Sequence, residues 1–449
     1  MSTERTWERR TIAAKGLQSL GFRGAEIVAQ ALLIAVTARF LGPSGRGLYA
    51  LAALASVIFA LPLGSVWSTL ALDLARGRRP LAGLVTTALV ISAAGGCAVA
   101  VVGLLVSILF GAHWWVIALP ALITPALVFL TYAQGFYQAL GHVAAFHTVR
   151  VARIAAPLVF VSAALLAGAG IRGIIAAWAL SFVVLVPPVL VHLVRVSGRP
   201  APPDRSAGEY LRALAVGARF LPGNAALALD LRVALPLLAM LSTTAVVGVY
   251  SVAVSVAELV RLGSRSIYIG SFADIGSRER EAAAALTARA VRHSLLLALV
   301  ASLAVVPATK LLLPPVVGPG YGDVPLLLAL LLPGIAALAA FPTLTAFFSV
   351  QDGRPETVTV AAMLLVGVSA ACMLLLVRPF GASGAAVASS VGALVGAGFL
   401  ARAFLQATRL PAAAIVPGRA EADDYLRLGR ALARRRPTLL RARTRTGDA

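Results

Sequence analysis

Arginine and carboxylate side chains lie inside long apolar segments of this sequence, and they are the residues best able to do chemistry. A guanidinium group binds phosphate oxygens through paired, charge-assisted hydrogen bonds. A buried carboxylate can titrate near neutral pH and so hold a proton or pair with a cation. The sequence therefore offers two kinds of candidate, cations for an anionic ligand and acids for a coupling ion.

Arg23 and Glu26 open the first of these segments. Only twelve uncharged residues separate Glu26 from Arg39, and they make about 18 Å of helix. Arg23 and Glu26 are three residues apart and share one helix face. In one interpretation they line a hydrated cavity. In the other, Arg23 extends to lipid headgroups with Glu26 as its partner.

A second set of charges lies in the stretch VAVSVAELVRLGSRS, residues 252–266. Glu258, Arg261 and Arg265 follow at i, i+3 and i+7, on one face of an otherwise apolar helix. Glu258 lies about 20 Å along the helix from the start of its segment near Ala245. Glu258 is therefore expected at membrane depth, where it either binds a coupling proton or cation or forms a structural salt bridge. Arg261 is the better cavity candidate of the two arginines, and Arg265 fits an anchor at the membrane surface.

Asp230 and Arg232 lie inside the preceding apolar segment. Residues two apart on a helix do not face each other. At least one of them therefore needs a partner on another helix, and that partner is either a structural contact or a substrate or ion. Asp73 and Asp274 adjoin basic loops; they either bind a coupling proton or cation, or anchor helix ends in salt bridges.

Membrane-spanning helices must position these residues. Hydrophobic residues make up 59% of the 449 residues and charged residues only 13%, with a mean hydropathy of +0.90. Average soluble domains are about 45–50% apolar and about 25% charged. Apolar runs recur along the whole chain, so the sequence predicts an all-α integral membrane protein.

Twelve segments are long enough to cross a bilayer as helices. They cover residues 20–41, 47–72, 81–110, 114–139, 144–168, 172–195, 212–241, 245–272, 287–313, 324–350, 356–377 and 383–406. Few basic residues, among them Arg46, fall on one side of the membrane. Many, among them Arg150 and Arg153, fall on the other, so both termini are expected in the cytoplasm. The same bias explains the net charge of +21 without a nucleic-acid partner.

Two related halves are expected. GLYALA at 47–52 matches GVYSVA at 248–253, an offset of 201 that also places Asp73 on Asp274. A duplicated six-helix unit keeps its orientation, so a pseudo-twofold axis along the membrane normal relates the two bundles. The expected organisation is a cytoplasmic N-terminal segment 1–19, a bundle 20–196, a Pro-rich cytoplasmic hinge 197–211, a bundle 212–407 and a basic cytoplasmic tail 408–449.

Three stretches resemble a known family. ARFLGPSGRGLYALAALASVIFALPLG at 38–64 is similar to the first loop and second helix of oligosaccharide flippases, the lipid-linked oligosaccharide exporters of the multidrug/oligosaccharidyl-lipid/polysaccharide (MOP) superfamily. LDLRVALPLLAMLSTTAVVGVYSVAVSVAELV at 229–260 resembles that family's seventh and eighth helices, and GASGAAVASSVGALVG at 381–396 resembles its last. The resemblance covers about residues 16–407.

The resemblance implies two bundles in a V around a central cavity that opens alternately to the two sides of the bacterial cytoplasmic membrane. It implies a polyprenyl-(pyro)phosphate-linked oligosaccharide as substrate, flipped for surface polysaccharide biosynthesis, with polysaccharide assembly proteins as candidate partners. Moving such a charged headgroup from water into the apolar bilayer costs a large desolvation free energy. Arg23, Arg232 and Arg261, with Glu26 beside them, are the expected cavity residues.

Two alternatives remain open. A cation-coupled exporter of drugs or metabolites from the same superfamily would need carboxylates and aromatic residues in its cavity, whereas this chain offers more buried arginine than unpaired acid. A membrane polysaccharide polymerase or ligase would need an outer catalytic loop, and the outer connections are short. The sequence has no Walker-type glycine loop, metal-spaced His/Cys cluster or nucleophile elbow, so no enzyme activity, metal or cofactor is expected.

The tail reads EADDYLRLGRALARRRPTLLRARTRTGDA from residue 421. Its apolar and basic side chains fall on different faces of a helix: Tyr425, Leu428 and Leu432 on one, and Arg427, Arg430 and Arg434 on the other. This pattern predicts a basic amphipathic helix on the anionic inner leaflet. Docking on a protein partner is the alternative.

Overall fold

The computed structural model describes residues 2–75, 79–140, 142–197, 207–229, 232–425 and 427. These residues form helices and short connections and contain no strand. The elements are α1 (Ser2–Gly64), α2 (Trp67–Ala75), α3 (Leu81–Val90), η1 (Ile91–Gly95), α4 (Gly96–Ser107), η2 (Ile108–His113), α5 (Trp115–Leu122), α6 (Thr124–Ala139), α7 (Val143–Leu166), α8 (Ile171–Ser197), α9 (Ala207–Leu229), α10 (Ala234–Leu241), α11 (Thr244–Ser277), α12 (Arg280–Val317), α13 (Val324–Leu338), α14 (Phe341–Ala346), η3 (Phe347–Gln351), α15 (Pro355–Thr408) and η4 (Ala412–Ile415).

Nine helical stretches of the described chain are long and apolar enough to cross a membrane. Two of them carry two crossings each, because the chain turns back at Gly42 (φ 64°) in α1 and at Gly381 (φ 55°) in α15. Only glycine adopts such angles without a Cβ penalty. The crossing expected at 212–241 falls on α9 and α10, on either side of two residues outside the described chain. The expected all-α membrane fold is confirmed.

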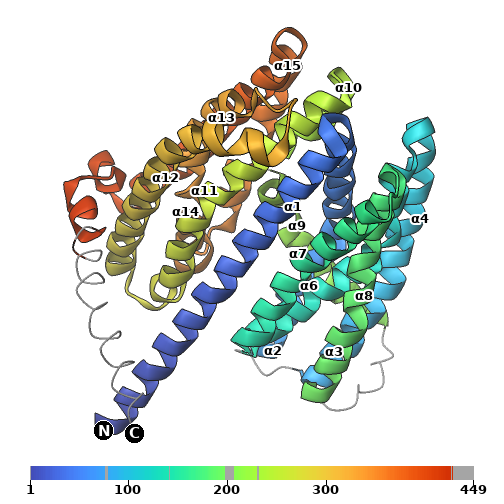
Figure 1. Ribbon diagram of the computed structural model, residues 1–449. Helices are drawn as coiled ribbons and strands as arrows, with labels where there is room; N and C mark the ends of the chain where they lie inside the picture. The colour runs from blue at the N-terminus through green and yellow to red at the C-terminus, as the bar shows by residue number, and fades with distance from the viewer. Residues whose placement is uncertain are drawn as a thin grey trace, which may run out of the picture.

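Two hydrophobic cores divide the helices into halves (Figure 1). One core lies among the helices from α1 to α9 and contains the buried rings of Tyr132 and Phe136. The other lies mainly among α10 to α15 and contains Tyr250 and Phe347. In Figure 1 the long blue helix α1 runs between the two groups. The bundle boundaries at 196 and 212 stay predictions, since most of the expected hinge is outside the described residues and helix begins again at Ala207.

The two halves touch where α1 passes α11. We call this end of the molecule, which carries Gly42, Ser242 and Gly381, the distal end. Here Gly47 and Gly248 pack backbone to backbone: a Cβ on Gly47 would strike the carbonyl of Thr244, and a Cβ on Gly248 would strike the carbonyl of Pro43. The offset of 201 pairs Gly47 with Gly248 and Pro43 with Thr244, so it exchanges the two contacts. The pseudo-twofold axis therefore passes close to this glycine pair.

The opposite end, which carries Ser2, Arg79, Arg354 and Thr408, is called the terminal end. Here α9 packs against the start of α2, and a Cβ on Gly217 would lie 2.7 Å from Cγ2 of Val66. Because α9 also packs against α15, it links the two halves near the terminal end.

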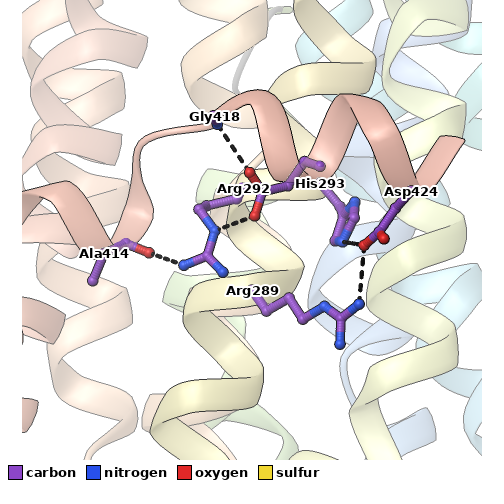
Figure 2. Close-up of polar contacts among 7 residues, drawn as sticks. Arg289, Arg292, His293, Ala414, Gly418 and Asp424 are labelled. Carbon is purple, nitrogen blue, oxygen red and sulfur yellow. Dashed lines mark hydrogen bonds and ion pairs between the residues drawn. The ribbon is translucent and has the colours of Figure 1, made fainter. Parts of the chain in front are cut away.

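The first helical residues of the tail, 419–425, dock on α12 at the terminal end (Figure 2). Arg292 donates from Nε to Glu421 and from Nη1 to the carbonyl of Ala414 at 2.6 Å. Asp424 accepts from Arg289 Nη2 at 3.1 Å and lies 3.8 Å from His293 Nε2. The basic part of the tail from residue 428 lies outside the described residues, so its contact with lipid stays a prediction.

Candidate functional site: an arginine-lined cavity between the halves

A cavity of about 660 Å³ lies between the two halves. One wall comes from α1, α6, α7 and α8, and the other from residues 232–258 of α10 and α11 with the turn before them. Ten of its lining residues are polar or charged: Gln30, Arg46, Ser56, Gln134, Arg150, Arg153, Arg232, Ser251, Ser255 and Glu258. So many polar side chains at membrane depth indicate a hydrated, functional space.

A smaller cavity of about 270 Å³ adjoins the first. The two share Ser56, Val57, Leu127 and Arg153, and the smaller one follows α1 to Trp67 at the start of α2. The polar space therefore extends from Arg46, one turn beyond the distal Gly42, toward the terminal end.

Two of the four cavity arginines pair with carboxylates. Arg150, in α7, lies 2.7 Å from Glu26 of α1 through Nη2 and donates from Nε at 2.8 Å. Arg232, just before α10, lies 3.0 Å from Glu258 of α11. Each pair joins two helices of one half, so these four charges balance locally.

The other two cavity arginines, Arg46 and Arg153, have no carboxylate partner among the described residues. Arg46 is 6% exposed and donates from Nη1 to Thr37 at 2.8 Å and from Nη2 to Ser255 at 3.4 Å. Its Nε has no hydrogen-bond partner. Arg153 donates from Nη1 to Gln134 at 2.8 Å.

The cavity therefore has an excess of positive charge. Four guanidinium groups face two carboxylates, those of Glu258 and of Glu26 behind Arg150. An uncompensated charge away from bulk water is costly, and an anionic ligand would offset that cost. The geometry of a guanidinium group suits phosphate or carboxylate oxygens.

Arg46 also connects the two halves, because Thr37 and Ser255 lie on α1 and α11. Its Cζ lies 5.3 Å from the ring centre of Tyr49, within the range of a cation–π contact. Nearby, Tyr321 donates to the carbonyl of Ala38 at 3.0 Å. A ligand bound at Arg46 would thus contact a residue whose hydrogen bonds depend on how the halves meet.

The structure brings some of the expected site residues together. Arg232 and Glu258 lie on the cavity wall and pair with each other, and Glu26 is buried behind the wall against Arg150. Arg261, half-buried on α11, is not among the lining residues of this cavity. The binding roles of these residues stay predictions.

Other expected site residues lie away from the cavity or outside what can be described. The side chain of Arg23 and the whole of Asp230 are outside the described part of the chain. Asp73 is half-buried on α2, and Asp274 lies 3.6 Å from Arg278 at an exposed position. Their coupling or structural roles stay predictions.

Sequence reasoning missed Arg46, Arg150 and Arg153 as cavity residues. From the sequence, Arg46 is expected in an outer loop. In the structure the helix resumes directly after Gly42, so Arg46 lies on a helix and faces the cavity between the halves. Arg150 and Arg153 counted with the basic loops, although they lie seven and ten residues beyond Val143, where α7 begins. Their spacing of three residues, which places both on one helix face, was the available signal.

No family model and no curated protein matches this chain in sequence. Solved structures do match its fold. An inward-facing multidrug resistance MATE family transporter of the MOP superfamily superposes with a TM-score of 0.66 and 19% identity, over 85% of this chain and 95% of its own. The lipid II flippase MurJ, in an inward closed conformation, gives 0.63 and 12% over 88% and 89%.

A mutant of the MATE transporter VcmN of Vibrio cholerae gives a TM-score of 0.58 with 16% identity, over 89% of this chain and 98% of its own. Nearly the whole length of each protein is covered, so the likeness extends to both halves. The identities are low, and the likeness therefore concerns the fold alone. This chain has the twelve-helix fold of the MOP-superfamily transporters, the fold that MurJ and the MATE proteins share.

Proposed function

We propose that this protein is a transporter that flips a polyprenyl-(pyro)phosphate-linked oligosaccharide across the bacterial cytoplasmic membrane. The observation that carries the proposal is the pair of cavity arginines, Arg46 and Arg153, that have no carboxylate partner in the described chain. A pyrophosphate bridge between a lipid and a sugar carries one negative charge on each phosphate group, which matches two guanidinium groups that lack a carboxylate counterion.

In this proposal the headgroup enters the cavity while the polyprenyl chain stays in the bilayer. Arg46 and Arg153 bind phosphate oxygens and replace the hydration that the anion loses. The amides of Gln30 and Gln134 and the hydroxyl of Ser56 on the cavity wall suit the hydroxyl groups of a sugar. Rocking of one half against the other then changes the side on which the headgroup is exposed.

The proposed orientation places the terminal end, with both chain termini, in the cytoplasm. The excess of arginine in the connections at that end supports it. The basic tail would then lie near anionic lipids of the inner leaflet. Proteins of surface polysaccharide assembly are the proposed partners.

A cation-coupled exporter of drugs or metabolites is the second candidate, because MATE transporters are among the structural neighbours. Such a protein needs carboxylates free to bind a cation. In the described part of this cavity Glu258 and the neighbouring Glu26 are both paired with arginine. The charge balance therefore favours an anionic substrate.

A complementation experiment tests the proposal. Arg46→Gln and Arg153→Gln are expressed at wild-type level in a strain that lacks the native gene, and surface polysaccharide and lipid-linked intermediates are measured. We expect both variants to lose surface polymer and accumulate the lipid-linked intermediate. Arg378→Gln, at an exposed distal position, serves as control and should complement. Full activity of both cavity variants, or drug resistance without any effect on polysaccharide, would refute the proposal.

A further inference from the structure

We propose that the protein has a binding site for an anionic phospholipid at the terminal end of α15, separate from the cavity between the halves. The site is a pocket of about 790 Å³ formed where the first and last turns of α15 lie together. They meet because α15 turns back at Gly381. The polar and charged lining residues are Arg354, Glu356, Thr357, Arg402 and Gln406.

Two guanidinium groups converge on this pocket without a partner. The side chains of Arg354 and Arg402 form no hydrogen bond or ion pair with any residue in the described ranges. The backbone N–H of Arg354 donates to the carbonyl of Phe348 at 2.8 Å, which holds this arginine at the pocket rim. Paired arginines at a membrane boundary bind phosphate groups of lipids.

Apolar side chains continue the pocket along both arms of α15. Val360 and Met363 on the first arm are 44% and 62% exposed, and Val395 and Phe399 on the second are 40% and 36% exposed. They follow the polar residues at helical spacing, so an exposed apolar stripe leads from the pocket into the membrane. A soluble anion would make no contact with this apolar stripe, whereas the acyl chains of a phospholipid would pack against it.

The charge of the pocket favours an anionic lipid over a zwitterionic one. Arg354 and Arg402 outnumber Glu356, the one carboxylate on the wall, and α15 begins at the pocket with Pro355. The start of a helix adds partial positive charge. The sequence beyond residue 427 is rich in arginine, so its charge does not complement that of this pocket.

Arg280 connects the pocket to the rest of the second half. It lies 2.7 Å from Asp352 and donates to the carbonyl of Ala407 at 3.4 Å, next to the lining residues. A lipid bound between Arg354 and Arg402 would hold together the two ends of α15 that Arg280 ties to α12. In the orientation proposed above, that lipid belongs to the cytoplasmic leaflet.

The test compares lipid binding to the purified full-length protein by native mass spectrometry and thermal unfolding. The probes are phosphatidylglycerol, phosphatidylethanolamine and inorganic phosphate at equal concentration. We expect phosphatidylglycerol to be retained and to raise the melting temperature. Arg354→Gln with Arg402→Gln should weaken its binding about 25-fold, from about fivefold for each arginine. The control pair Arg172→Gln with Arg378→Gln, exposed at the distal end, should leave binding unchanged.

Glu356→Gln separates the two lipid classes. Loss of the carboxylate should tighten phosphatidylglycerol binding. If it weakens binding and the wild-type protein prefers phosphatidylethanolamine, the occupant is zwitterionic and the proposal is wrong. The proposal would also be overturned if inorganic phosphate raised the melting temperature as much as phosphatidylglycerol does. Equal phosphatidylglycerol binding by the wild-type and double-variant proteins would overturn it as well. The lipid site is separate from the substrate cavity. Arg46→Gln should therefore abolish flipping and leave phosphatidylglycerol binding unchanged.

Discussion

Replacement of Gly248 by alanine should open the distal contact between the halves. The added Cβ would strike the carbonyl oxygen of Pro43, with the carbonyl carbon at 2.8 Å and the N of Gly47 at 3.0 Å. All of these are backbone atoms, so no flexible side chain can move aside. Relief requires α1 and α11 to separate at this point.

The magnitude follows from the type of clash. Overpacking of a tight contact costs about 1–3 kcal/mol. Because the cost arises only when the distal ends touch, it shifts the equilibrium toward distally separated states by about 5- to 150-fold. Gly47→Ala should act in the same way through Thr244. The double variant should cost less than the sum of the two, since one separation relieves both clashes.

The assay measures the distance between spin labels at Ser44 and Asp323, two exposed distal positions on the two halves, after Cys97 and Cys372 are replaced by serine. We expect Gly248→Ala to add a population at longer distance. The control is Gly367→Ala, since this helical glycine of α15 has no atom within 4 Å of its added Cβ. Identical distance distributions for folded wild-type and Gly248→Ala proteins would refute the reasoning.

Three smaller changes test other contacts. Glu26→Gln leaves Arg150 without its counterion and should lower the free energy of unfolding by about 2 kcal/mol. The loss is smaller than the roughly 3–5 kcal/mol for a fully buried pair, because 27% of the Arg150 side chain is exposed. An unchanged denaturation midpoint would contradict this prediction. Tyr321→Phe removes a hydrogen bond between the halves and should cost about 1 kcal/mol in the same measurement. Burial raises the pKa of Glu421, but hydrogen bonds from Arg292 and the backbone outweigh it, so the pKa is lowered. Tail docking is therefore complete at pH 7 and weakens progressively as the pH falls below about 4. Release from α12 between pH 7 and 6, read from limited proteolysis, would contradict this sign.

The helices and the duplication could be predicted because both depend on local signals. Apolar segments long enough to span a bilayer have few alternatives to helix. The match between GLYALA and GVYSVA marks equivalent positions in the two halves, and the structure adds that Gly47 and Gly248 touch. Sequence similarity identifies equivalent residues, but it does not say which of them lie on the symmetry axis.

The cavity was harder to predict because its walls depend on how helices from two halves meet. Arg46 lies in a stretch that reads as a loop, and only the turn at Gly42 places it one turn into the next helix. Arg153 reads as part of a basic loop region but lies ten residues into α7. Arg261 shares a helix face with Glu258, yet the cavity wall ends at Glu258, one turn before it. Such boundaries are properties of tertiary packing rather than of local pattern.

The most direct test of the anion-binding cavity is flipping of a fluorescent polyprenyl-pyrophosphate saccharide by purified protein in liposomes. We expect the wild-type protein to flip this lipid, and the double variant Arg46→Gln with Arg153→Gln to lose at least 90% of the rate, about a tenfold effect that corresponds to about 1.4 kcal/mol of lost charge-assisted binding. A lipid with the same saccharide but an uncharged linkage should not be flipped faster than in empty liposomes. Equal rates for the charged and uncharged lipids, with no loss in the double variant, would contradict the account.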